Sequence, residues 1–165
     1  MPPETDNLRL EELFLADQQD RQAVYDSPAA VKELKHRDGM RKTLVLEMIT
    51  QGEVNTSTDL HRASVILYHG SEPRDFLAAH RLAVMAAING HRPSRFIAAA
   101  ALDRFLMVVG MAQFYGTQFE HNPEENRYQL RLPLEDLAML TWEKKFFSVP
   151  AVADRLKQLN GRIHG

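Results

Sequence analysis

Three segments of this chain combine acidic and basic side chains in ways that could support proton transfer. Asp17 and Arg21 are four residues apart, Asp103 and Arg104 are adjacent within an apolar run, and His69 ends a third segment. An acid and a base at i and i+4 share one helix face and can pair. Imidazole changes charge near neutral pH and is the most frequent general acid or base. We therefore predict acid–base chemistry with His69, Asp103 and Asp17 as the catalytic groups.

The segment QFYGTQF, residues 113–119, gathers amides, a hydroxyl and aromatic rings around one glycine. Connecting loops usually favour Gly, Pro, Asn, Asp and Ser, so this composition indicates the wall of a polar pocket. We expect the loop to close over charged groups and to position a substrate through Gln113, Tyr115, Thr117 and Gln118. The alternative is a simple helix exit in which Gly116 adopts a positive φ.

Helical-wheel positions point several charged groups toward the interior. Asp17 lies in the direction of Leu13 and Phe14, and Asp103 lies beside Met107. Isolated buried charges are strongly unfavourable, so we expect the groups to meet in one network that lines a single cavity.

Three arginines are predicted to hold a carboxylate or to stabilise a developing oxyanion. These predicted substrate anchors are Arg21, Arg62 and Arg104. The same wheels direct His80 and Arg41 inward, where a purely structural role is the alternative.

A structural interpretation is open for every inward-facing charge, and Asp103 separates the two views. If Asp103 only completes a core ion pair, Asp103→Asn should unfold the protein. If the groups are catalytic, His69→Ala and Asp103→Asn should abolish activity and change the thermal midpoint by only a few degrees.

The elements that must position these groups are mostly helices. Apolar periodicity predicts a mainly α fold, a compact single-domain helical bundle with repeat-like helical hairpins. A short β-hairpin is expected near residues 119–132, where a polar turn precedes alternating apolar positions. Helices are expected over about 8–25, 29–51 with an interruption or a bend near Gly39, 57–69, 73–89 and 93–109, and again after 134 and 151. We predict a flexible arm over 1–7, a domain over 8–160 and a tail over 161–165.

Composition narrows the class of protein. The chain has 165 residues, 44% of them hydrophobic, a net charge of −2 and no cysteine, which is typical of one cytoplasmic globular domain. No apolar run approaches the roughly 20 residues of a membrane span, and the charge gives no attraction to nucleic acid. Motifs with metal-ligand spacing and glycine-rich phosphate loops are lacking. We therefore expect no metal, cofactor, nucleic-acid or membrane partner, and leave a homodimer open.

The motifs resemble those of a widespread bacterial family known only by a domain-of-unknown-function label. The family is marked by D-Q-x-x-R, Q-H, D-R and Q-x-Y-G-T-Q. The corresponding residues here are Asp17-Gln18-x-x-Arg21, Tyr68-His69, Asp103-Arg104 and Gln113-x-Tyr115-Gly116-Thr117-Gln118, within roughly residues 8–160. The chain departs at Tyr68, where the family commonly has Gln. The resemblance implies a mostly helical fold and a common site, but no particular reaction.

These observations favour a small, metal-independent enzyme. Its expected reaction is hydrolysis, cyclisation or elimination on a small carbonyl-containing or peptidyl substrate. The alternative is a helical-repeat-like binding or adaptor module for a peptide or protein partner. An enzyme should hide its unusual groups in a pocket, whereas an adaptor should display them on a concave surface.

Overall fold

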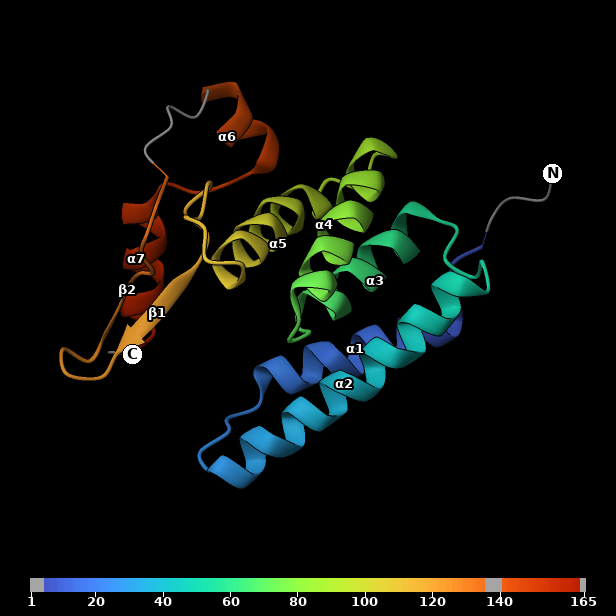
Figure 1. Ribbon diagram of the computed structural model, residues 1–165, viewed down its shortest axis with the longest axis horizontal. Helices are drawn as coiled ribbons and strands as arrows, with labels where there is room; N and C mark the ends of the chain where they lie inside the picture. The colour runs from blue at the N-terminus through green and yellow to red at the C-terminus, as the bar shows by residue number, and fades with distance from the viewer. Residues whose placement is uncertain (1–4, 136–140, 164–165) are drawn as a thin grey trace.

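The computed structural model describes residues 5–135 and 141–163, and most of them are helical (Figure 1). The chain order is α1 (Leu8–Gln22), α2 (Pro28–Thr50), α3 (Ser57–Tyr68), α4 (Pro73–Ile88), α5 (Ser94–Val108), β1 (Phe119–Asn122), β2 (Arg127–Leu130), α6 (Thr141–Phe147) and α7 (Val152–Gly161). The predicted mainly α fold with one β-hairpin is confirmed.

The first three helices begin at side chains that satisfy their free backbone N–H groups. The Asn7 side chain accepts from the backbone of α1, and Ser27 does the same for α2, just before Pro28. Thr56 and Asp59 form a capping box at the start of α3. Local sequence therefore fixes where these helices start.

Two groups of helices pack against each other (Figure 1). α1 and α2 run antiparallel along one side, and α3, α4 and α5 follow one another on the other side. The core between them is made of Leu10, Val45, Met48, Ala63, Ile66, Leu67, Ala79 and Ala101. Small alanines that are fully buried on α4 and α5 let these two helices approach closely. This is the helical-hairpin packing that the sequence predicts.

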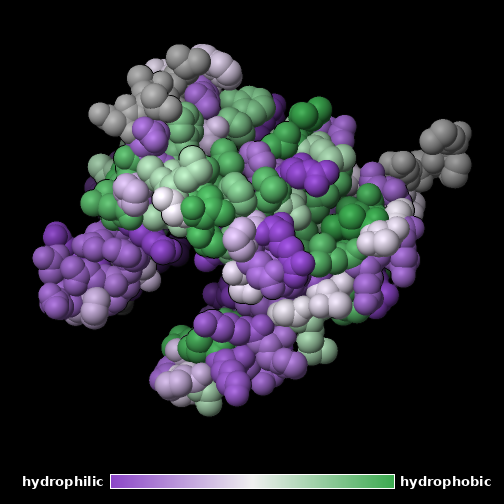
Figure 2. Space-filling model, viewed as in Figure 1, coloured by the Kyte–Doolittle hydropathy of each residue, from purple (hydrophilic) through white to green (hydrophobic). Residues whose placement is uncertain are grey.

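The β-hairpin lies at the far side of α5 from α1 and α2 (Figure 1). β1 and β2 are antiparallel, with Phe119 opposite Leu130. α7 is joined to β2 through the Asn160 side chain, which accepts from the Tyr128 N–H at 2.6 Å and donates to the Tyr128 carbonyl at 3.2 Å. The space-filling view shows polar side chains over the hairpin and apolar ones over the central helices (Figure 2).

Three boundaries differ from the sequence-based expectation. α1 ends at Gln22, so Val24 lies beyond the helix and is 89% exposed instead of joining the apolar stripe. α2 continues through Gly39 without interruption. In the predicted arm, Asp6 accepts a hydrogen bond from the Thr56 hydroxyl, and the Asn7 N–H donates one to Asp59. Residues 1–4 lie outside the described part.

The helical tail was expected to begin at Leu134, but Leu134 and Glu135 are not helical. Residues 136–140 and 164–165 lie outside the described residues, and α6 spans Thr141–Phe147. Among the helices of the described ranges, none combines the length and apolar character needed to cross a lipid bilayer.

Candidate functional site

A cavity of about 380 Å³ opens between α2, the turn that joins α3 to α4, and α5. This volume lies within the usual range for small-molecule sites. Its lining residues are Arg21, Val31, Leu34, Lys35, Asp38, Gly39, Lys42, His69, Gly70, Ser71 and Arg104. Cationic side chains therefore outnumber anionic ones in the wall.

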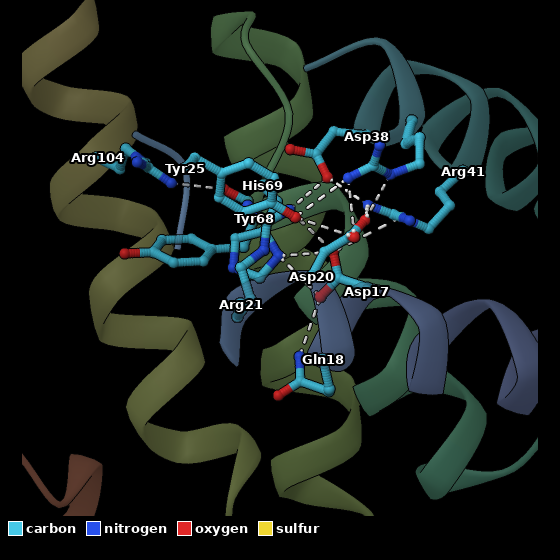
Figure 3. Close-up of polar contacts among 11 residues, drawn as sticks. Asp17, Gln18, Asp20, Arg21, Tyr25, Asp38, Arg41, Tyr68, His69 and Arg104 are labelled. Carbon is cyan, nitrogen blue, oxygen red and sulfur yellow. Dashed lines mark hydrogen bonds and ion pairs between the residues drawn. The ribbon is translucent and has the colours of Figure 1, made fainter. Parts of the chain in front are cut away.

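His69 is held at the cavity by a fully buried carboxylate, and we call these two residues the Asp17–His69 pair (Figure 3). Nδ1 of His69 lies 2.9 Å and 3.0 Å from the two carboxylate oxygens of Asp17. No described residue hydrogen-bonds Nε2 of His69. Since His69 also lines the cavity, Nε2 is the ring nitrogen left for a ligand.

Asp17 stays ionised because its neighbours outweigh its burial. Burial alone would raise its pKa, but the hydrogen bond and charge of His69 and of Arg21 hold the pKa below its usual value. An ionised carboxylate only accepts hydrogen bonds. Nδ1 of His69 must therefore donate, which leaves the lone pair of the neutral ring on Nε2. The D-Q-x-x-R spacing serves this acid directly, because Gln18 Nε2 donates to it at 3.0 Å and Arg21 at 3.2 Å.

Asp20, Asp38 and Arg41 extend the network behind Asp17 (Figure 3), and Arg37 pairs with Asp20. Arg41 donates to Asp20 and Asp38 at 2.7 Å each, and Arg21 also pairs with Asp38. A hydrogen bond from Arg37 is the main reason that the pKa of Asp20 falls to about 2. The acids are thus matched by guanidinium groups. Within the described ranges no His, Asp and Glu side chains form a cluster of three or more suited to a metal ion.

The turn between α3 and α4 is shaped by Asp75. Its carboxylate accepts from the backbone N–H groups of Ser71 and Glu72 at 3.1 Å each, and from Lys42 at 3.0 Å. Gly70 lies so close that an added Cβ would approach the Asp75 side chain to 2.5 Å. A glycine is therefore required next to His69 for the turn to close.

Arg104 reaches the cavity from α5 and is held by contacts other than carboxylates. Its Nη1 donates to the Tyr68 carbonyl at 2.8 Å. Its guanidinium lies 4.7 Å from the centre of the Tyr68 ring and 5.3 Å from that of Phe76, a cation–π arrangement. No ion pair joins Arg104 to a carboxylate of the described residues.

Asp103 has a different role from the one predicted. It is fully buried and anchors the loop of residues 113–118, which we call the glycine loop. Its carboxylate accepts from the backbone N–H groups of Phe114, Tyr115 and Thr117 at 2.7, 2.8 and 2.9 Å, and from the Thr117 hydroxyl at 2.7 Å. These partners saturate Asp103, so no oxygen is left to orient His69.

The predicted substrate-positioning groups of the glycine loop are also used internally. The buried Gln113 bonds across the loop to the backbone of Gln118 and to the Arg131 carbonyl. Tyr115 donates to Glu143 at 3.1 Å, and its burial together with this contact raises the pKa of the phenol. Gly116 has φ +73°, as the helix-exit alternative requires.

Gln118 links the glycine loop to the cavity side of the molecule. Its Nε2 donates to the Ala100 carbonyl at 3.1 Å and to the Tyr68 hydroxyl at 3.3 Å. Tyr68 in turn contacts Arg104 through its carbonyl and its ring. The prediction of one hollow shared by all the charged groups is wrong: among the predicted groups only Arg21, His69 and Arg104 line the cavity, and Asp17 backs it.

Arg62 does not join this site either. It pairs with Asp6, Glu11 and Asp59 at the start of α3. Arg62 and His69 share one side of the helix wheel, but seven residues separate them by about 10 Å along the axis. His80 bonds the Ala98 carbonyl at 2.8 Å and so connects α4 with α5.

Sequence reasoning missed several groups of the cavity wall, chiefly Asp38, Lys42 and the turn at Gly70. Asp38 was accessible to the same logic, because it follows Leu34 by four residues and precedes Arg41 by three on one helix face. No local signal marks Lys42, because its partner Asp75 is 33 residues away on α4. Gly70 marks the end of a helix in the sequence, but nothing local places it at a cavity.

Comparison of the chain with protein-family models, with curated proteins and with solved structures finds no match. The resemblance to the bacterial family of unknown function therefore stays a prediction.

Proposed function

We propose that this protein is a small enzyme that uses acid–base chemistry at the Asp17–His69 pair. The observation that carries the proposal is a histidine fixed by a buried carboxylate, with its second ring nitrogen unclaimed by any described residue, in the wall of a cavity of about 380 Å³. The reaction class is hydrolysis, cyclisation or elimination on a small carbonyl-containing or peptidyl substrate. No metal or cofactor enters the proposal.

In the proposed mechanism, Nε2 of His69 removes a proton from water or from the substrate. The imidazolium that forms is stabilised by the ionised Asp17. Nε2 then returns the proton to the leaving group or the product. Arg104, which lines the same cavity, is the group that can stabilise negative charge on a substrate oxygen.

The adaptor alternative is disfavoured by the position of the unusual groups. An adaptor displays its recognition side chains, but Asp17 is 0% exposed and His69 is largely covered. Exposed apolar side chains on α4 and after α5, such as Met85, Ile88 and Met111, are separate from the cavity wall.

A first test needs no substrate. Long-range ¹H–¹⁵N NMR spectra of the imidazole rings report which nitrogen carries the proton. The spectra are recorded over a series of pH values, and in those of the neutral ring His69 should carry its proton on Nδ1, which faces Asp17. Asp17→Asn should weaken this preference. A His69 ring with its proton on Nε2 in the wild-type protein would contradict the proposed base.

A second test measures turnover on a panel of small esters, lactones, amides and short peptides. Loss of a general base typically costs 10²- to 10⁴-fold in rate, so His69→Gln should reduce kcat/KM by at least about 100-fold. His36→Gln is the matched control, because His36 is exposed on α2 and outside the cavity wall. Equal loss in both variants, or none in His69→Gln, would refute the role of His69.

A further inference from the structure

We infer that the cavity selects substrates that carry an oxyanion, a carboxylate or a phosphate, and that Arg104 is the residue that binds it. The inference rests on the proposed function only in taking this cavity as the substrate site. It adds the chemical class of the substrate and the residue that determines specificity.

Two of the four arginine and lysine side chains in the cavity wall already have protein partners. Arg21 pairs with Asp17 and Asp38, and Lys42 lies 3.0 Å from Asp75. Arg104 and Lys35 have no ion pair among the described residues, although both line the cavity. Two uncompensated positive charges therefore face one space.

Arg104 is fixed and partly desolvated without being neutralised. Only Nη1 has a hydrogen-bond acceptor in the described part of the chain, the Tyr68 carbonyl, and the Tyr68 and Phe76 rings flank the group. A guanidinium has five N–H donors in a fixed plane and suits paired oxygen atoms. An anion that enters the cavity would supply the missing acceptors and charge.

The cavity wall also has an apolar part. α2 contributes Val31 and Leu34 to the cavity, so an apolar surface lies in the same space as the cations. A ligand that satisfies both kinds of surface has an anionic group and an apolar body. Small organic acids and monoesters of phosphate share this chemistry.

The test compares three probes with the same phenyl body: 3-phenylpropionate, its neutral amide, and 2-phenylethyl phosphate. Dissociation constants are measured by NMR titration of the full-length protein at constant ionic strength. At least one anionic probe should bind at least about tenfold more tightly than the amide, because a charge-assisted contact to a guanidinium is then gained. The tighter of the two anions identifies the natural anionic group. Equal binding of the amide and both anions overturns the inference.

Variants then assign the contact. Arg104→Met should abolish the preference for the anions, Arg104→Lys should retain part of it, and Arg81→Met on the exposed face of α4 should leave it unchanged. A folded Arg104→Met variant that keeps the preference overturns the assignment.

Arg104 also packs on two rings, so a substitution that does not alter packing is needed as well. Lys35→Met changes an exposed side chain and should weaken anion binding by about threefold. An unchanged preference in Lys35→Met, together with an unfolded Arg104→Met, overturns the inference.

Failure of this inference can be told apart from failure of the proposed function. Anion-selective binding with no turnover in any assay supports the inference and removes the catalytic role of His69. Turnover of neutral substrates with no preference for anions supports the proposed acid–base function and overturns the anion selectivity.

Discussion

Asp17 and Asp103 are both fully buried, and both lie close to an arginine in sequence, yet they end in different surroundings. Asp103 is surrounded by backbone N–H groups and a hydroxyl of the glycine loop. Asp17 faces side chains, one of which is a histidine with a ring nitrogen still unclaimed at a cavity. The difference teaches that burial of an acid does not indicate catalysis. What distinguishes the proposed site is an unfilled hydrogen-bonding position at the end of the network.

The largest expected effect on stability comes from Asp103→Asn. Asparagine can accept from Phe114 and Tyr115, but its amide nitrogen would then face the N–H of Thr117, so donors meet donors. We expect the free energy of unfolding to fall by about 3 kcal/mol, measured by urea denaturation. This reverses the expectation, drawn from the sequence, of a small thermal change.

Two further variants sharpen that comparison. Asp26→Asn, at an exposed position, is the control and should change stability by less than about 0.5 kcal/mol. Asp17→Asn should cost less stability than Asp103→Asn but more activity. If Asp17→Asn is the more destabilising of the two and both retain activity, the functional distinction between the two acids is lost.

Gly70→Ala should have the next largest effect and should act on the cavity side alone. The new methyl group would lie 2.5 to 2.8 Å from side-chain atoms of Asp75, which is itself held by Ser71, Glu72 and Lys42. Overpacking of this kind costs about 2 kcal/mol. The displaced turn should also weaken binding of 3-phenylpropionate, measured in the same titration.

The control for Gly70→Ala is Gly161→Ala at the end of α7, where an added Cβ meets nothing within 4 Å. It should not lower the free energy of unfolding and should leave binding unchanged. Normal stability and binding in Gly70→Ala would mean that the turn next to His69 is not fixed by Asp75.

The cluster of His61, Ser94 and His91 provides a comparison with the Asp17–His69 pair, because its histidines bond to a residue within the fold. Ser94 is fully buried between His61 and His91, whose Nδ1 atoms lie 3.0 and 2.9 Å from its hydroxyl, and the two rings stack. Burial, followed by the charges of His91 and Arg62, lowers the pKa of His61 to about 4. The folded protein therefore binds fewer protons than the unfolded chain between about pH 6.5 and 4.

The sign of the pH effect follows from this difference. Stability should fall as the pH drops from about 6.5 to 4, by about 1–2 kcal/mol from His61 after allowance for its partial exposure. His61→Gln should remove that part of the pH dependence, whereas the exposed His36→Gln should not, as measured by denaturation at several pH values. An unchanged pH profile in His61→Gln would show that His61 titrates normally in the folded state.

Most of the fold could be predicted because its signals are local. Pro28 and Thr56 mark helix starts, and the alanines of α4 and α5 indicate close packing. Gly39 misled the prediction because an isolated glycine weakens a helix without ending it. Val24 misled it because periodicity continued past the point where α1 stops.

The site was only partly predictable from the sequence. A helix wheel gives the direction in which a side chain points, but neither its position along the helix axis nor the residues it contacts. Arg62 points to the same side as His69 but lies about two turns before it in α3, where it pairs with Asp59. Asp103 points inward as expected, yet its partners belong to a loop whose path the sequence does not reveal. The Asp17–His69 contact joins residues 52 positions apart. Only the structure shows that Asp103 has all its hydrogen-bond partners within the fold, whereas His69 beside Asp17 keeps one ring nitrogen that no described residue bonds.

Gly39→Ala is the smallest of the expected effects and tests the part of the cavity wall that α2 contributes. Gly39 lies inside the continuous helix α2, and a Cβ there would meet nothing within 4 Å. Alanine should therefore stabilise the protein by about 0.5–1 kcal/mol, because it restricts the unfolded chain and favours the helix. Since Gly39 lines the cavity, the same methyl group narrows the site, and binding of 3-phenylpropionate shows whether that space is used. Lower stability in this variant would mean that α2 needs a glycine at this point, and the two glycines of the wall would then be equivalent instead of one being required by space and the other not.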